Sequence, residues 1–167
     1  MQKEVLMKQI PSLKKKFLYS EDYGKATMSD IFPQKDLDAA LNLFCFDLET
    51  CWWENQGGKF IRHALPKQAQ LSPVQGIVAA DQNGDGQVDL MMAGNKYGFE
   101  VETNRCDASN GALFLGDGKG NFSWLDNLQT GFWATREARD LVMLRGSGGK
   151  HVFVVANNNR PAQIYQR

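Results

Sequence analysis

Apolar residues in the first 41 positions recur at the spacing of an α-helix. One helix face is formed, at intervals of four, three and four residues, by Leu6, Ile10, Leu13 and Phe17. Pro11 lies inside this pattern. Because proline has no backbone N–H and its ring clashes with the preceding turn, the pattern predicts two short helices or a kink at this position.

Two further helices are predicted before residue 42. Ser20 is a good N-cap residue, and the acidic residues that follow it are favoured in the first turn by the helix dipole. Pro33 suits the first turn of a third helix that runs through Leu37 and Leu41. Residues 1–41 are therefore predicted to form a helical segment.

From residue 42 onward the pattern changes to short apolar or alternating runs that are bounded by Gly, Asn and Asp. Such runs are typical of strands in a sandwich, barrel or propeller. The predicted strands are Leu43–Leu48, Thr50–Glu54, Phe60–Ala64, Val74–Ala80, Val88–Ala93, Gly111–Leu115, Asn121–Leu125, Arg139–Leu144, His151–Ala156 and Ala162–Tyr165.

The strand region repeats itself. A Gly-rich turn closes on Phe60 and again on Phe122, which are 62 residues apart. A separate apolar run ends at Asn95 and again at Asn158, which are 63 residues apart. Two independent landmarks thus give nearly the same period, and a period near 60 fits one four-stranded propeller blade with a long loop.

Grouped by this period, residues 42–167 contain the last two strands of one blade, one complete blade, and three strands of a third. We therefore expect a mainly β fold made of antiparallel β-propeller blades, about one full and two incomplete, after the helical segment. The remainder of the ring would come from a longer chain or from an oligomer. The alternative is a small stand-alone sheet domain, which would leave open sheet edges.

The clearest chemical feature is the loop Asp81–Asp89, with the sequence D-Q-N-G-D-G-Q-V-D. Side-chain oxygens fall at its positions 1, 3, 5 and 9, a glycine occupies position 6, and the backbone carbonyl of position 7 can fill a gap. Calcium takes six to eight oxygen ligands of this kind. We predict a Ca²⁺ site whose ligands are Asp81, Asn83, Asp85, Gln87 and Asp89.

Alternatives to this calcium site differ in the ion and in the loop type. An EF-hand is excluded, because Met92 replaces the bidentate Glu of position 12 and both flanks read as strands. Mg²⁺ prefers few protein ligands and retained water. A metal-free turn is also possible with these residue types, although three carboxylates would repel one another without a cation. The equivalent loop Leu144–Lys150 has no Asp and two basic residues, so no metal is expected there.

Composition narrows the functional classes. The 167 residues carry 19 basic and 19 acidic side chains, so bulk charge does not draw the chain to nucleic acid. No apolar run approaches the ~20 residues of a membrane span, and the N-terminus has no secretory signal pattern. The three cysteines form no C-x-x-C and are expected to be small buried or partly buried thiols. His63 and His151 have no acidic or Cys partner at ligand spacing, which favours strand surface positions.

The loop 81–89 followed by L-M-M-A-G-N, and the later L-F-L-G-D-G-K-G-N-F of residues 113–122, resemble the FG-GAP/VCBS repeat. Residues 93–98 and 105–111 resemble a bacterial subgroup that is often joined to an ASPIC/UnbV-type module. The resemblance runs from the helical segment to the C-terminus and places this stretch at the end of a longer protein. It implies a β-propeller scaffold that binds a protein or glycan ligand, in an extracytoplasmic location.

Other candidate sites are less defined. The loop from Asn95 to Asn110, which carries Glu100, Glu102, Arg105 and Asp107, is either a binding edge or a structural cover, and Asn95 or Asp107 could add an oxygen to the calcium. The four tryptophans could form a sugar platform, but core packing is the preferred interpretation for most. No catalytic motif is present. We therefore expect a non-enzymatic module, the alternative being an accessory domain of a larger enzyme, for example a glycan-active one.

Overall fold

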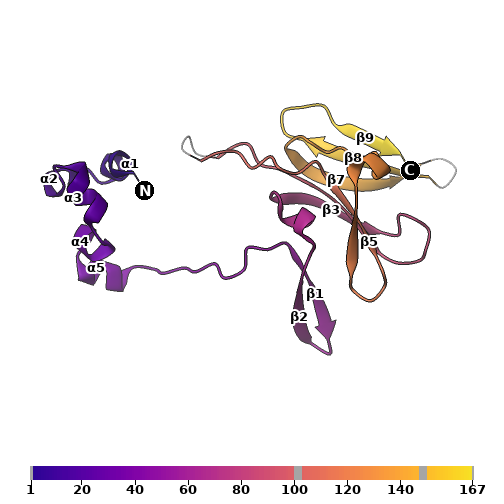
Figure 1. Ribbon diagram of the computed structural model, residues 1–167, viewed down its shortest axis with the longest axis horizontal. Coiled ribbons are helices and arrows are strands. Elements are labelled where there is room, and N and C mark those ends of the chain that lie inside the picture. The colour runs from indigo at the N-terminus through magenta and orange to yellow at the C-terminus, as the bar shows by residue number, and fades with distance from the viewer. Residues whose placement is uncertain (1, 100–102, 147–149, 167) are drawn as a thin grey trace. The chain divides into compact units, whose positions relative to one another are not determined.

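The computed structural model describes residues 2–99, 103–146 and 150–166. The chain divides into two compact units, residues 1–46 and 47–167, and each is described by itself. The first unit is helical, and the second is built from antiparallel sheets (Figure 1). The prediction of a mainly β chain with an N-terminal helical segment is therefore confirmed.

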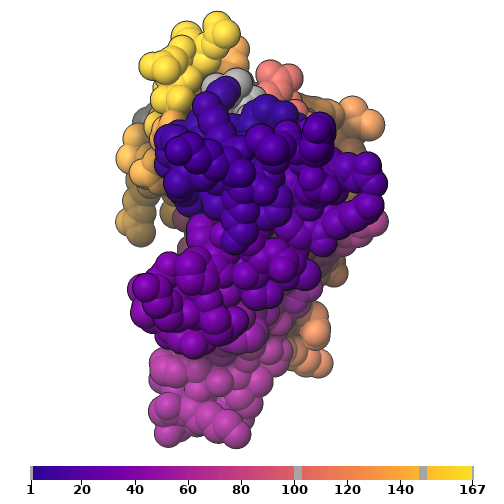
Figure 2. Space-filling model, turned by 90° about the vertical axis from the view of Figure 1, so that its left-hand side faces the viewer, coloured from indigo at the N-terminus to yellow at the C-terminus, as the bar shows by residue number. Residues whose placement is uncertain are grey.

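Five short helices make up the first unit, and they form a continuous indigo-to-purple surface (Figure 2). They are α1 (Lys3–Gln9), α2 (Leu13–Lys16), α3 (Ser20–Lys25), α4 (Met28–Ile31) and α5 (Gln34–Ala39). Pro11 separates α1 from α2, as expected. The predicted helix face packs together with two further side chains, and the buried core of this unit is Leu6, Met7, Leu13, Phe17 and Ile31.

The helix ends differ from the prediction in three places. Ser20 is the first residue of α3 and not its N-cap, and Tyr19 in the cap position offers no side-chain hydrogen bond. The unpredicted helix α4 begins with a capping box, in which the Thr27 backbone N–H donates to Asp30 Oδ2 at 2.8 Å. Helix α5 ends at Ala39, so Leu41 lies outside it and is exposed.

Three separate antiparallel sheets form the second unit, and each is made of strands that are consecutive in the chain. The first is the hairpin β1 (Cys51–Gln56) and β2 (Lys59–Ala64). The middle sheet has four strands: β3 (Val74–Ala80), β4 (Asp89–Gly94), β5 (Ala112–Gly116) and β6 (Phe122–Leu125). The third sheet has β7 (Ala138–Arg145), β8 (His151–Asn157) and β9 (Gln163–Gln166). The grouping into two, four and three strands is the one that the repeat predicted.

One predicted strand, Leu43–Leu48, is absent. This segment has no strand beside it, and its side chains Leu43, Phe44, Phe46 and Leu48 are exposed. Alternating apolar residues favour a strand, but a strand also needs a partner for its backbone groups. In the second unit, two further short elements were not predicted: the 3₁₀ turn η1 (Lys67–Gln70) and the helix α6 (Asn127–Thr130).

The middle sheet is covered on both faces. Met91, Ala93 and Leu113 point to one side and form a core with side chains of the third sheet, including Leu141 and Phe153. Their neighbours along the strands point to the opposite side, as the pleat requires. That second core joins the middle sheet to the β1–β2 hairpin and η1 through Met92, Ala112, Phe114, Leu65, Ala69 and Trp52.

The first strands of the middle and third sheets are in close contact. A Cβ atom on Gly76 of β3 would lie only 2.3 Å from the backbone nitrogen of Leu141 in β7. Glycine at this position therefore allows the two backbones to approach. The three sheets pack on one another through the two cores described above. They do not close into a ring within the described residues, so the propeller is treated below as a proposal.

Candidate metal centre

The predicted calcium loop connects β3 to β4 at one end of the middle sheet. The pairing of Ala80 with Asp89 closes the loop, which spans residues 81–88. Gly84 and Gly86 have φ angles of 82° and 83°, a backbone conformation that only glycine adopts without strain. These two glycines therefore allow the tight turn of the loop between β3 and β4.

Asp81 is the centre of the hydrogen bonding inside the loop. Its Oδ1 accepts backbone N–H bonds from Gly84 at 2.7 Å and Asn83 at 3.2 Å, and its Oδ2 accepts one from Gly86 at 2.8 Å. The bond from Gly86, supported by those from Gly84 and Asn83, holds the pKa of the Asp81 carboxyl below its usual value. Asp81 is therefore ionised over a wider pH range than a free aspartate.

Asn83 and Asp85 are bonded to each other at the exposed tip of the loop. The Asn83 Nδ2 donates to Asp85 Oδ2 at 2.8 Å, and the Asp85 backbone N–H donates to Asn83 Oδ1 at 2.9 Å. The Gln87 backbone N–H donates to Asp85 Oδ1 at 2.7 Å. Each side-chain oxygen that accepts one bond here keeps a lone pair for another partner.

Asp89 differs from the other loop carboxylates because it is fully buried, with 0% of its surface exposed. Its Oδ2 accepts the backbone N–H of Gln82 at 2.8 Å, and its Oδ1 accepts that of Gly116 in β5 at 2.9 Å. The Asp89 side chain thus links the start of the loop, at Gln82, to the end of the neighbouring strand β5, at Gly116. The sequence pattern identified Asp89 as a ligand but not as this structural link.

The five predicted ligands fit a hard cation by their chemistry, since all offer oxygen and no basic residue lies among them. Gln82, also in the loop, has a buried side-chain amide without a hydrogen-bond partner among the described residues, which is unfavourable for a polar group. Within the same residues, however, no three acidic, His or Cys side chains are grouped as a metal cluster. Calcium at this loop therefore stays a prediction.

Asn95 has a structural role at the other end of β4. It is fully buried, its Nδ2 donates to the Ser109 carbonyl at 2.8 Å, and its Oδ1 accepts the Ser109 N–H at 3.1 Å. Its Nδ2 also reaches the carbonyls of Thr135 and Arg136 at 3.3 Å. The Asn95 amide thus holds the loop at Ser109 and the segment at Thr135–Arg136. It lies at the opposite end of β4 from Asp89, so it does not add an oxygen to the predicted calcium site.

The long loop after Asn95 is partly a structural cover. Lys96 and Cys106 pair through their backbones, and Arg105 Nε lies 2.6 Å from Asp107 Oδ2. Glu100 and Glu102, which this loop also carries, lie outside the described residues. So does the centre of the loop between β7 and β8, residues 147–149, where no metal was expected.

His63, which has no acidic partner at ligand spacing in the sequence, has one in the structure. His63 Nε2 lies 3.0 Å from Glu54 Oε2, and its ring stacks on Trp52 at 4.3 Å. His63 and Glu54 are diagonal neighbours across the β1–β2 hairpin, a relation that sequence spacing does not reveal.

Asp47 and Glu49 both bind the guanidinium of Arg62, and the distance from Arg62 Nη2 to Glu49 Oε2 is 2.7 Å. The hydrogen bond from Arg62 to Asp47 holds the pKa of the Asp47 carboxyl below its usual value.

The cysteine prediction is confirmed for two of the three residues. Cys51 and Cys106 are partly buried, as expected, whereas Cys45 is exposed. Cys45 lies in the segment 43–48, where the missing strand leaves side chains in solvent.

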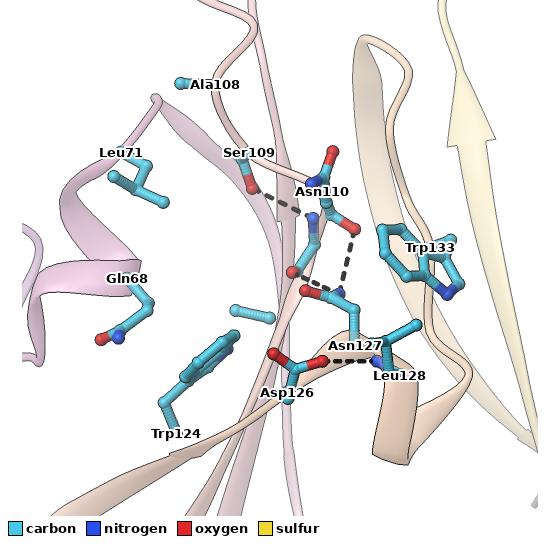
Figure 3. Close-up of a pocket in the computed structure, with 12 residues that line it drawn as sticks. Gln68, Leu71, Ala108, Ser109, Asn110, Trp124, Asp126, Asn127, Leu128 and Trp133 are labelled. Atoms are coloured by element: carbon cyan, nitrogen blue, oxygen red, sulfur yellow. Dashed lines mark hydrogen bonds between the residues drawn. The ribbon is translucent and has the colours of Figure 1, made fainter.

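A cavity of about 350 Å³ lies between η1, β6 and α6. Figure 3 shows Trp124 and Trp133 on either side of Asp126 and Asn127. The Asn127 Nδ2 donates to the carbonyls of Gly111 and Phe132 at 3.0 and 2.6 Å, so its amide is structural. The two indoles remain as apolar groups that could contact a ligand, and Gln68 and Asp126 line the same cavity. Trp52 and Trp124 pack against the second core, whereas Trp53 and Trp133 are exposed, so core packing holds for two of the four tryptophans and not for most of them.

Comparison with family models, curated proteins and solved structures gives no match for this chain. Among the described residues, no helix is long and apolar enough to cross a membrane.

Proposed function

We propose that this protein is a non-enzymatic, calcium-stabilised β-propeller repeat module that serves as a scaffold or binding surface of a bacterial extracytoplasmic protein. The observation that carries the proposal is the loop Asp81–Asp89, which closes the first hairpin of a complete four-stranded antiparallel sheet. Its oxygen-rich sequence is suited to Ca²⁺, and the FG-GAP/VCBS resemblance points to the same architecture.

Calcium would be held by Asp81, Asn83 and Asp85, with the carbonyl of Gln87 and with Asp89. Bound there, it would neutralise three carboxylates and brace the β3–β4 connection. We assign it no part in a reaction. The stacking of three sheets of two, four and three consecutive strands supports a blade-like repeat.

Calcium addition should raise the unfolding temperature of the full chain, and chelator should lower it. An ion that binds only the folded state stabilises it by mass action, by about 2.7 kcal/mol at a concentration one hundred times its Kd. Asp85→Ala should remove most of the response, as measured by calorimetry in calcium and in chelator.

The matched control is Asp107→Ala, which removes an aspartate that pairs with Arg105. Asp107 follows Cys106, which pairs with Lys96 beyond the end of β4 opposite the loop, so the structure does not place it as an additional calcium ligand. It should keep the full calcium response. If chelator leaves the wild type unchanged, or if Asp85→Ala responds as the wild type does, the metal site is wrong.

A second candidate is an accessory domain of a glycan-active enzyme whose catalytic part lies elsewhere. The cavity between Trp124 and Trp133 favours it, since indole rings stack on the apolar faces of sugars and the nearby Asp126 and Gln68 can bind hydroxyl groups. The same cavity would serve as the binding surface of the scaffold.

A further inference from the structure

The third sheet has an apolar face that none of the described elements of its unit covers. Val142 of β7 pairs with Val154 of β8, which pairs with Ile164 of β9, so the three side chains form one row across the sheet. Val142 is 41% exposed and Ile164 is 69% exposed. We call these three residues the outer row.

The outer row has an exact counterpart inside the stack. In the middle sheet, Val78 pairs with Met91, which pairs with Leu113, and all three are buried against the third sheet. The two rows correspond in register. In both sheets the first strand has its irregularity two residues before the row, next to Gly76 in β3 and to Asp140 in β7. The outer row is thus the type of face that elsewhere in this chain accepts another sheet.

The β1–β2 hairpin exposes the complementary type of face at the other end of the stack. Phe60 pairs with Asn55 and the matched Phe122 pairs with Gly116. Two residues before these partners stand Trp53 and Phe114, and Phe114 is 0% exposed. Trp53 is 53% exposed and Phe60 is 61% exposed. In the middle sheet, the equivalent side is the one buried against the preceding hairpin.

We infer that the outer row of one copy of this chain docks against the Trp53–Phe60 face of a second copy, head to tail. The face carries Arg62 as well, and its guanidinium is already paired with Asp47 and Glu49. A contact between two different faces leaves one of each free at the ends, so it extends with concentration unless the rotation closes a ring.

Asp140 indicates why the occupant is a two-stranded hairpin. It stands at the position of Gly76, where the missing Cβ lets another strand approach. If a complete sheet packed on the outer row as the third sheet packs on the middle one, its first strand would lie against Asp140 and meet the exposed carboxylate of that residue. The β1–β2 hairpin corresponds to the last two strands of a sheet and brings no such strand, so it can cover Val154 and Ile164 without that clash.

The inference rests on the blade-like repeat of the proposed function but not on its calcium. Sedimentation of the full chain should show a mass above the monomer that increases with concentration. Ile164→Lys and Trp53→Lys should each lower the association constant at least tenfold, because a charge is buried. Leu128→Lys, at an 83% exposed position on α6, should have no effect.

Mixing the two variants tests the head-to-tail geometry. Formation of a heterodimer would also show that both variants remain folded, because each must supply one intact face. Ile164→Lys keeps an intact hairpin face and Trp53→Lys keeps an intact outer row, so a mixture should form a one-to-one heterodimer and stop there. A monomeric wild type, a homodimer of Trp53→Lys, or a mixture without heterodimer would overturn the inference. Repeating the measurement in chelator separates it from the calcium proposal, because assembly that persists without a calcium response contradicts only the latter.

Discussion

At the scale of single residues, the middle sheet depends on buried polar side chains that satisfy backbone groups. Asp89 accepts N–H bonds from Gln82 and Gly116, and Asn95 exchanges bonds with both backbone groups of Ser109. Both residues are fully buried. A buried backbone group that loses its partner costs far more than an exposed one, so these two side chains hold the ends of β4 in place.

Asp89→Ala should destabilise the protein even in chelator. The substitution leaves the N–H groups of the buried Gln82 and the partly buried Gly116 without acceptors. A fully buried group that loses its partner costs about 1–3 kcal/mol, and a partly buried one costs less. Urea denaturation in chelator measures this loss apart from any effect of calcium.

Asp85→Ala under the same conditions is the control, because Asp85 is exposed at the tip of the loop. Equal destabilisation by the two variants would contradict a special structural role for Asp89.

At the scale of elements, connections between strands are held by pairs that join distant segments. Glu137, just before β7, accepts a bond from the Asn158 Nδ2 at the end of β8 at 2.8 Å. The Asn158 N–H also donates to the Glu137 carbonyl at 2.9 Å. The repeat landmarks Asn95 and Asn158 thus bond to the same segment, residues 135–137, from two sheets.

Stability should fall in acid partly through Glu137. Asn158 first, and then the Tyr97 backbone and Arg139, lower the pKa of the Glu137 carboxyl below its ordinary 4.5. A depressed pKa in the folded state gives stability that is present above 4.5 and is lost as the pH falls through the folded-state pKa.

Glu137→Gln should therefore flatten the dependence of unfolding free energy on pH below 4.5, as measured by urea denaturation over a pH series. A wild-type slope retained in Glu137→Gln would contradict the assignment.

At the scale of the whole molecule, the contact between β3 and β7 determines how the middle and third sheets stack. The backbone at Gly76 touches that of Leu141, and the core behind it contains side chains of both sheets. Interiors of this density do not absorb an extra methyl group without movement.

Gly76→Ala should destabilise the protein by about 1–3 kcal/mol through overpacking. The new Cβ would lie 2.3 Å from a backbone atom, which cannot rotate away as a side chain could. Gly98→Ala is the control, because a Cβ at Gly98 would meet open space. Comparable midpoints of urea denaturation for the two variants would show that the close approach is not required.

The sequence by itself determined the local features of this protein. Proline and glycine interrupt the periodic runs, so the break at Pro11 and the hairpins ending at Phe60 and Phe122 followed from backbone restrictions that act within a few residues. The repeat period then predicted how the strands group into sheets, because antiparallel neighbours joined by short turns pair with each other. The oxygen-rich loop was recognised for the same local reason.

Only the tertiary structure decided which side chains meet across long separations. Leu43–Leu48 has the pattern of a strand but does not form one, because strand formation depends on a neighbouring strand that its own sequence does not specify. Asp89 reaches Gly116, Asn95 reaches Thr135, and His63 reaches Glu54 through sheet register and loop packing. These contacts arise from the folding of the whole chain, and spacing along the sequence carries no record of them.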